Sequence, residues 1–333
     1  MISIDEERIF EVIRQRKPHS VALNGPEALI PKLQIACDHI TETFGIPSYV
    51  IGDTCWGSCD LNTHAAEMLG AEILFNIGHT VAMGSFGSKV VMINAYDDIS
   101  FDKVADKCAR DLVGRYHTLS LLTDSQHLLQ LDKVREIFNQ RGFETIIGKG
   151  KGQLTDGQVF GCEFYPAHSV QGRVDAFVFL GQSMFHAASV SMSTGKPTFM
   201  LDPYFEQYSE VSDFANTLQK RAILSIYKAV DAEKFGLVIG LKEGQFSHLQ
   251  ALELKKEFEK AGKSVQLIAL TDITEERIQN FRGIDAFIQV ACPRIATDNH
   301  FAKPMLSVPQ AHALLKIWKK QPIDDFLKLR NWL

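Results

Sequence analysis

The segment Asp175-Ala176-Phe177-Val178-Phe179 is a short apolar strand, and the chain contains it in three versions. The other two are Ala71-Glu72-Ile73-Leu74-Phe75 and Asp285-Ala286-Phe287-Ile288-Gln289. Each version leads into a loop that contains glycine or cysteine. The period of roughly 100 residues is too long for a solenoid, whose repeats span roughly 20–50 residues. We therefore predict a threefold internal repeat of one folded unit.

Each version is the third strand of a strand–helix–strand–helix–strand run. In the first run the strands are expected at 20–23, 48–51 and 71–75, with helices at 28–44 and 62–69 between them. Short apolar strands that alternate with helices imply parallel sheets with right-handed crossovers. The predicted fold class is α/β, with three pseudo-equivalent small parallel-sheet (βαβαβ) domains around a pseudo-threefold centre. The expected domains are 1–104, 105–215 and 216–333, the last ending in a C-terminal helix.

Composition and charge exclude several classes of protein. The 333 residues are 45% apolar and 23% charged, which is typical of a soluble globular protein. A formal net charge of −5 argues against a nucleic-acid binder, which would usually carry a basic patch. No apolar run is long enough to span a membrane, and residues 1–7 lack the apolar core of a secretory signal peptide. We expect a cytoplasmic protein.

One cysteine per repeat lies in a loop. Cys59 belongs to Gly52-Asp53-Thr54-Cys55-Trp56-Gly57-Ser58-Cys59-Asp60, which follows a strand, Cys162 follows a glycine-rich loop, and Cys292 directly follows the strand 285–289. Open α/β folds bind their ligands at the carboxyl ends of strands. We therefore predict that these three thiolates converge on one inorganic cofactor. Their positions are not equivalent, because Cys59 and Cys162 follow the second strand of their repeats and Cys292 follows the third.

Two of the other three cysteines are expected to be structural, and Cys55 is not assigned as a ligand. Cys37 and Cys108 lie on apolar faces of predicted helices, where free cysteine behaves as a small hydrophobe. Cys55 forms a CxxxC pair with Cys59, but that spacing alone is a weak signal, and the CxxxCxxC motif of ordinary radical SAM enzymes is absent. In a cytoplasmic protein of this size we expect no disulfide framework.

Two kinds of metal site suit three converging thiolates. Three thiolates without an obvious fourth suit an iron–sulfur cluster with one iron open to substrate. The alternative is a Cys₃His structural zinc site, with His64 or His79 as the fourth ligand. Structural zinc ligands usually come as close CxxC pairs, which favours the cluster. His168 and His186 also follow strands, but we expect hydrogen-bonded structural roles for them and assign no general base.

At these residues the chain resembles the family of 2-(3-amino-3-carboxypropyl)histidine synthases, which carry out the first step of diphthamide synthesis, in its archaeal single-subunit form. The matching stretches span nearly the whole chain in the family's order. They are 52–60, Gly78-His79, Gly157-Gln158-Val159-Phe160-Gly161-Cys162, Gly181-Gln182-Ser183-Met184-Phe185-His186, Thr194-Gly195-Lys196-Pro197, Asp202-Pro203-Tyr204 and Ala291-Cys292-Pro293-Arg294-Ile295-Ala296-Thr297-Asp298.

The resemblance implies a central 4Fe–4S cluster whose cysteine ligands fall on Cys59, Cys162 and Cys292. It also implies a reaction. The reduced cluster donates an electron to S-adenosylmethionine, the bond from sulfur to the γ carbon of the methionyl group breaks, and methylthioadenosine leaves. The 3-amino-3-carboxypropyl radical then adds to C2 of a histidine of translation elongation factor 2. An electron donor and a homodimer are further implied partners.

The resemblance also suggests contacts to S-adenosylmethionine. Gln245 matches a family position, and Pro26 and Glu27 lie in the corresponding loop of the first repeat. Asp298 would hold the amino group and Arg294 the carboxylate, by charge-assisted hydrogen bonds. Structural roles compete with these assignments: a helix cap for Glu27, a surface ion pair for Arg294 and a turn for Asp298.

Two other functions compete with this one. Quinolinate synthase has a similar architecture, with three pseudosymmetric domains that each supply one cluster cysteine, and it uses the open iron as a Lewis acid. The stretches around Cys162 and Cys292 favour the diphthamide family. A non-enzymatic alternative is a scaffold stapled by zinc.

Overall fold

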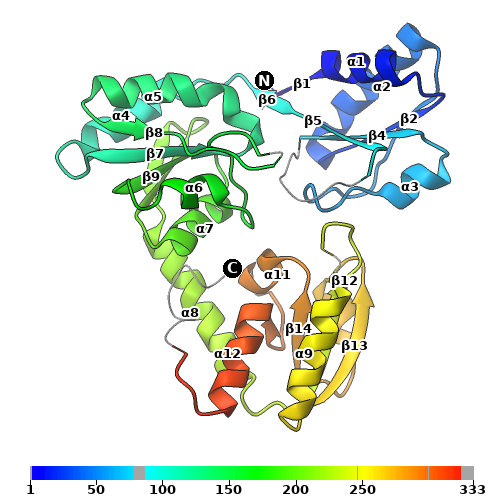
Figure 1. Ribbon diagram of the computed structural model, residues 1–333, viewed down its shortest axis with the longest axis vertical. Helices are drawn as coiled ribbons and strands as arrows, with labels where there is room; N and C mark the ends of the chain where they lie inside the picture. Colours follow the sequence, from blue (N-terminus) through cyan, green and yellow to red (C-terminus); the bar gives the residue numbers. More distant parts are fainter. Residues whose placement is uncertain (1, 79–86, 153, 246, 299, 324–333) are drawn as a thin grey trace.

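The computed structural model describes residues 2–78, 87–152, 154–245, 247–298 and 300–323. His79 and most of the predicted C-terminal helix therefore lie outside the described residues. The described chain forms three main sheets that belong to three successive parts of the sequence. Figure 1 places the first unit in blue to cyan at the upper right, the second in green at the upper left, and the third in yellow to red below them.

The first unit has a four-stranded parallel sheet in the order β3-β2-β4-β5. The predicted amphipathic helix near the start is confirmed as α1, which buries Ile9, Val12 and Ile13 against the sheet. The elements are α1 (Glu6–Arg16), β2 (Val21–Asn24), η1 (Glu27–Leu29), α2 (Ile30–Phe44), β3 (Ser48–Val50), α3 (Thr63–Met68), β4 (Ile73–Ile77) and β5 (Val90–Ile93).

The second unit has a five-stranded sheet in the order β11-β10-β9-β7-β8. Its elements are α4 (Asp102–Leu112), β7 (Thr118–Thr123), η2 (Ser125–Gln130), α5 (Leu131–Gln140), β8 (Glu144–Ile146), α6 (Tyr165–Val170), β9 (Ala176–Leu180), α7 (Met184–Thr194), β10 (Thr198–Asp202) and β11 (Gln207–Glu210). The long helix α8 (Ser212–Lys228) then leads to the third unit and contacts both α7 and α12.

The third unit has a four-stranded parallel sheet in the order β13-β12-β14-β15. Its elements are β12 (Lys234–Gly240), α9 (His248–Lys260), β13 (Ser264–Leu270), α10 (Glu275–Gln279), β14 (Ala286–Val290), α11 (Pro293–Asp298), β15 (Met305–Leu306) and α12 (Val308–Trp318). Among the described residues, no helix has the length and apolar character needed to cross a membrane.

The three sheets share one strand order, in which the first strand lies between the second and the third, and the fourth lies beyond the third. The strands predicted from the three related segments are β4, β9 and β14, and every residue in them is buried. The α/β fold class with parallel sheets is therefore confirmed. The predicted domain boundaries fall inside α4 and α8, and the division at these points stays a prediction.

Two antiparallel pairs were not expected from the sequence. β1 (Ile2–Ile4) pairs with β6 (Ala95–Asp97), and β11 pairs with β10 at the edge of the second sheet. Both β1 and β6 are three residues long, which is too short for a periodic pattern. β11 is mostly exposed and polar, so it lacks the apolar residues that mark a buried strand.

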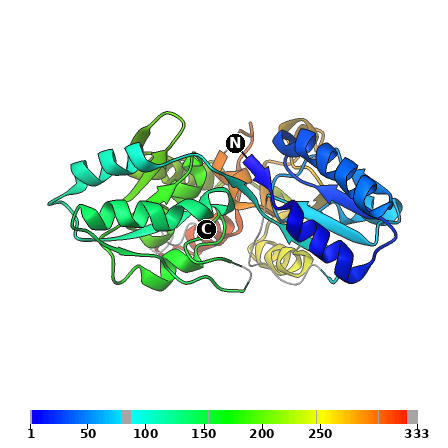
Figure 2. The ribbon, with the colours of Figure 1, turned by 90° about the horizontal axis from the view of Figure 1, so that it is seen from above.

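The units meet at the carboxyl ends of their strands. The third unit contacts the first where Gly244 N donates to Cys59 O at 3.0 Å, and the second contacts the first where Ser125 Oγ donates to Gly78 O at 3.0 Å. The Arg294 guanidinium lies 5.5 Å from the ring centre of Phe185, which joins the third unit to the second. In Figure 2 the first and second units lie on opposite sides, with parts of the third visible between them.

A buried histidine makes the stability of the second unit sensitive to acid. His127 in η2 is 2% exposed, and its ring packs edge-on against Phe101 with the centroids 5.0 Å apart. Burial lowers the pKa of His127 to about 4, so the folded protein holds this ring neutral where the unfolded chain would protonate it. The unfolded state therefore binds more protons between pH 4 and pH 6.5, and this histidine's contribution to the free energy of unfolding rises with pH in that window.

We expect His127→Phe to remove this dependence. The difference in unfolding free energy between the parent and the variant should shift by about 3 kcal/mol in favour of the parent from pH 4 to pH 7. Urea unfolding at a series of pH values measures it, with the exposed His300→Gln as the control that should give a flat difference. A pH-independent difference for His127→Phe would contradict the assignment.

Candidate metal centre

Cys59 is held by a loop of the third unit. The Gly244 backbone lies so close that an added Cβ would fall 2.5 Å from Cys59 Cβ, so a side chain at position 244 would displace the cysteine. Gln245 Nε2 donates to Cys59 Sγ at 3.3 Å. Within its own loop, the turn is closed by Asp60 N, which donates to Gly57 O at 3.0 Å. The position of Cys59 therefore depends on the third unit as much as on the first.

An ion pair beneath this loop joins the same two units. Lys242 Nζ contacts Asp60 Oδ2, and both residues are buried, while Asp272 Oδ1 lies 3.3 Å from the same Nζ. Beside it, Glu243 Oε1 accepts from Thr63 N at 2.8 Å and from Thr63 Oγ1 at 2.7 Å. We call the contacts of residues 59–63 with 242–245 the first–third interface. The sequence did not predict this interface, although a lysine–glutamate pair before a glycine follows a predicted strand there.

Cys162 is positioned by two glycines. The segment before it runs beside the end of β7, where Thr123 N donates to Gly157 O at 2.9 Å and Val159 N donates to Thr123 O at 2.8 Å. Gly157 has a positive φ of 75°, which favours glycine. At Gly161 an added Cβ would lie 1.8 Å from a ring carbon of Phe185, so the chain passes against the face of that ring.

Cys292 lies between the end of β14 and the start of α11. Its carbonyl accepts from Ile295 N at 3.1 Å and from Gln289 Nε2 at 2.9 Å. Cys292 and Cys59 are half-buried, whereas Cys162 is exposed as a residue although protein atoms crowd around its thiol.

The three thiols share one electrostatic environment. Burial is the main cause that raises the pKa of each, and it raises the pKa of Cys162 to about 12. Cys162 also feels the charges of Cys292 and Cys59, and Cys292 feels the charge of Cys59. The three sulfur atoms, one from each unit, thus lie within the range of direct Coulombic interaction.

The two kinds of metal site make different demands on the ligands. Among the described histidines, cysteines, aspartates and glutamates, no group of three or more is placed so that it could hold a metal ion. A zinc ion needs its thiolates about 2.3 Å from the metal. His64 lies exposed on α3, and His79 is outside the described residues. Which kind of site the three thiols form stays a prediction.

Two of the remaining cysteines belong to hydrophobic cores. Cys37 and Cys108 are buried in the cores of the first and second units, as predicted. Cys55 is also buried and accepts from Asn24 Nδ2 at 3.4 Å, and burial raises its pKa to about 12. It therefore belongs to a hydrogen-bonded layer beneath the loop that carries Cys59.

Of the predicted substrate contacts, the structure brings Gln245 to Cys59. Arg294 Nε and Asp298 Oδ2 pair with each other across one turn of α11 at 2.9 Å. Pro26 and Glu27 follow β2 at the carboxyl edge of the first sheet, and Glu27 is exposed in the first turn of η1. The roles of these five residues stay predictions.

His168 and His186 have structural surroundings. His186 packs among the rings of Phe160, Phe179 and Phe185, and His168 packs against Phe164 on α6. Burial lowers the pKa of His168. This agrees with structural roles and leaves the centre without an assigned general base.

Comparison with known proteins gives the family. The family model described as "Putative diphthamide synthesis protein" matches residues 25–324, which include all three loop cysteines. This chain belongs to that family. The resemblance inferred from the sequence motifs is therefore confirmed.

Several relatives of this diphthamide synthesis protein match along most of their length. The 2-(3-amino-3-carboxypropyl)histidine synthase of Pyrococcus horikoshii is 26% identical over 97% of this chain and 94% of its own. Subunit 1 of the Schizosaccharomyces pombe synthase is 28% identical over 96% of this chain and 76% of its own. A crystal structure of Dph2 from Pyrococcus horikoshii with a 4Fe–4S cluster has a TM-score of 0.87 at 25% identity, covering 95% of this chain and 92% of the other.

The glycine beside Cys59 offers one test. Gly244→Ala should push Cys59 away, because the added methyl group overlaps Cys59 Cβ, and it should destabilise the fold by about 1–3 kcal/mol. Metal content after anaerobic reconstitution should fall together with stability. Gly172→Ala is the matched control, since its added Cβ meets no atom within 4 Å. Equal metal content in both variants would contradict the role of Gly244.

The buried ion pair offers a second test. Lys242→Met should cost about 3–5 kcal/mol of unfolding free energy, because Asp60 is left buried without its cation. Lys103→Met breaks an exposed pair with Glu206 and should cost at most about 1 kcal/mol. Denaturant unfolding of both proteins measures the difference. The interpretation fails if the two variants are equally stable.

Proposed function

We propose that this protein catalyses the first step of diphthamide synthesis, the transfer of a 3-amino-3-carboxypropyl group from S-adenosylmethionine to C2 of a histidine of translation elongation factor 2. The observation that carries the proposal is the convergence of Cys59, Cys162 and Cys292, one from each unit. Family membership supports it, because curated relatives are named for this synthase activity.

The donor set of the centre suits a 4Fe–4S cluster. Three cysteine ligands leave one iron without a protein ligand, and that iron is where a substrate would bind. When bound and reduced, such a cluster would supply the electron that breaks the bond between the sulfonium and the γ carbon of S-adenosylmethionine. The transferred group would then bond to C2 of the imidazole, and the ring would become aromatic again as the C2 proton leaves to solvent and one electron returns to the oxidised cluster.

The residues around the centre would orient the substrate. The bond that breaks is the one held beside the open iron, so positioning decides the products. Arg294 and Asp298 already form an ion pair, and the methionyl end carries one carboxylate and one ammonium group. On binding, the methionyl end would replace this one ion pair with two. Its carboxylate would lie on Arg294 and its ammonium group on Asp298. Gln245, Pro26 and Glu27 would complete the site from the third and first units.

A protein substrate needs access to the centre. Cys162 is accessible to solvent, and Trp56, three residues before Cys59, is 71% exposed. Both features support docking of a large partner on this side. An electron donor and a second copy of the chain are the other partners we propose. Because the substrate is a translation factor, we place the reaction in the cytoplasm.

Mass spectrometry of the elongation factor tests the proposal. The anaerobically reconstituted protein, dithionite and S-adenosylmethionine should add one aminocarboxypropyl group to the factor and release one methylthioadenosine. Cys59→Ala, Cys162→Ala and Cys292→Ala should each lower both the iron content and the product, because each removes one thiolate of the centre. Cys108→Ala, which lies in the core of the second unit, should retain both.

Two outcomes would overturn the proposal. One is an unmodified elongation factor with a fully loaded protein, and the other is full iron content in all three cysteine variants. The quinolinate-synthase-like alternative would instead give quinolinate from dihydroxyacetone phosphate and iminoaspartate. We expect no quinolinate, since the chain belongs to the diphthamide family.

A further inference from the structure

Gln245 belongs to the third unit and reaches across to a sulfur of the first. It follows Gly244 in the first–third interface, and the two residues contact Cys59 at two points. Gly244 N donates to Cys59 O at 3.0 Å, and Gln245 Nε2 donates to Cys59 Sγ at 3.3 Å. The third unit therefore holds both the backbone and the sulfur of a cysteine that another unit supplies.

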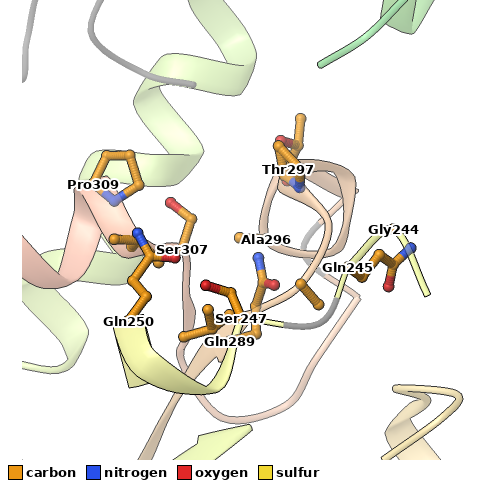
Figure 3. Close-up of a pocket in the computed structure, with 13 residues that line it drawn as sticks. Gly244, Gln245, Ser247, Gln250, Gln289, Ala296, Thr297, Ser307 and Pro309 are labelled. Carbon is orange, nitrogen blue, oxygen red and sulfur yellow. The ribbon is translucent and has the colours of Figure 1, made fainter. Parts of the chain in front are cut away.

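The fold fixes the position of this side chain. Gln245 N donates to Lys242 O at 2.9 Å, which closes a turn after β12. Gly240 lies so close on one side that an added Cβ would meet Gln245 Cβ and Oε1 at 3.4 Å each. Figure 3 shows Gln245 at the edge of a pocket of about 300 Å³, apart from Ser247 and Gln289 at its centre. Because a thiolate only accepts hydrogen bonds, Nε2 is the end of the amide that faces Cys59.

The three sulfur atoms of the centre differ in their hydrogen bonds. Burial raises the pKa of Cys292, and backbone N–H groups at the start of α11 oppose this by hydrogen bonding. Among the described residues, none donates a hydrogen bond to Cys162 Sγ. Burial also raises the pKa of Cys59, and the hydrogen bond from Gln245 is the largest opposing cause. Of the described side chains, Gln245 is thus the one that donates to a sulfur of the centre.

A donor on a sulfur ligand affects reduction as well as metal binding. One-electron reduction adds negative charge to an iron–sulfur cluster, and part of that charge lies on the sulfur atoms of its ligands. An N–H group stabilises this charge, so it favours the reduced state and raises the reduction potential. Hydrogen bonds to the sulfurs are among the main determinants of cluster potentials.

We propose that the Gln245 amide sets the reduction potential of the cluster at this centre through its hydrogen bond to Cys59 Sγ. The inference rests on the proposed function and adds to it a residue that acts through Cys59. In the proposed reaction the potential decides which electron donors are able to reduce the protein. Because Gln245 comes from the third unit, the potential also depends on an intact first–third interface.

An anaerobic redox titration tests the inference. The visible absorbance of the iron-loaded protein is followed with mediator dyes, without S-adenosylmethionine, to give the midpoint potential. Gln245→Met has a side chain of similar length without a donor, so its midpoint should shift to a more negative potential at the parent's iron content. Gln245→Lys restores an N–H donor, and its midpoint should return to the parent's value or lie above it. Gln250→Met, at an exposed position of the same pocket, is the control and should match the parent.

Three results would overturn the inference. The first is a midpoint of Gln245→Met that equals the parent's or is more positive. The second is a midpoint of Gln245→Lys that stays at the value of Gln245→Met, because a merely structural disturbance would affect both variants alike. The third is a loss of iron from Gln245→Met, since the side chain would then be needed to bind the cluster and not to set its potential.

The modification assay keeps this test independent of the proposed function. If the parent modifies the elongation factor but Gln245→Met keeps the parent's midpoint, only the role of Gln245 fails. If the midpoints shift as expected but the factor is never modified, the proposed reaction fails and the effect of Gln245 on the potential stands.

Discussion

The close approach of Gly244 to Cys59 is the constraint on which the centre depends. The two backbones are so near that a single added carbon would collide with the cysteine. That distance is set by the buried pair of Lys242 with Asp60 and by the hydrogen bonds of Glu243 to residue 63. A cysteine on a loop is otherwise free to move, and here its position is fixed by a different unit. The candidate metal centre is therefore a product of tertiary structure, since each unit carries one of the three cysteines proposed for it.

Burial raises the pKa of the same three cysteines. Thiols surrounded by protein and by one another resist losing their protons, and each would need to lose one to become a metal ligand. A positively charged metal group bound there would offset the charges of the three thiolates.

Much of this structure could be predicted from the sequence, because the signals were local. The strands β4, β9 and β14 are runs of apolar residues, and the helix that buries Ile9, Val12 and Ile13 has a clear amphipathic period. The loop cysteines were recognisable because each follows a strand. The short strands β1, β6 and β11 were not, since their pairing depends on distant partners.

The missed features of the centre share the same cause. The pairing of Lys242 with Asp60 joins residues that are distant in the sequence and adjacent only in the fold. Gln289 is a glutamine inside an otherwise apolar buried strand. The pocket that it lines exists only in the folded protein and could not be predicted from the strand alone. Local sequence patterns predict helices, strands and candidate metal ligands. Contacts between the three units are seen only in the structure.

The order of the three units along the chain has a mechanical consequence. The polypeptide connects the first unit to the second and, through α8, the second to the third, whereas the described contacts between the first and third units are hydrogen bonds and an ion pair. If a cluster joins Cys59 to Cys292 as proposed, it would add a covalent link between these two units, and losing it would weaken their contact.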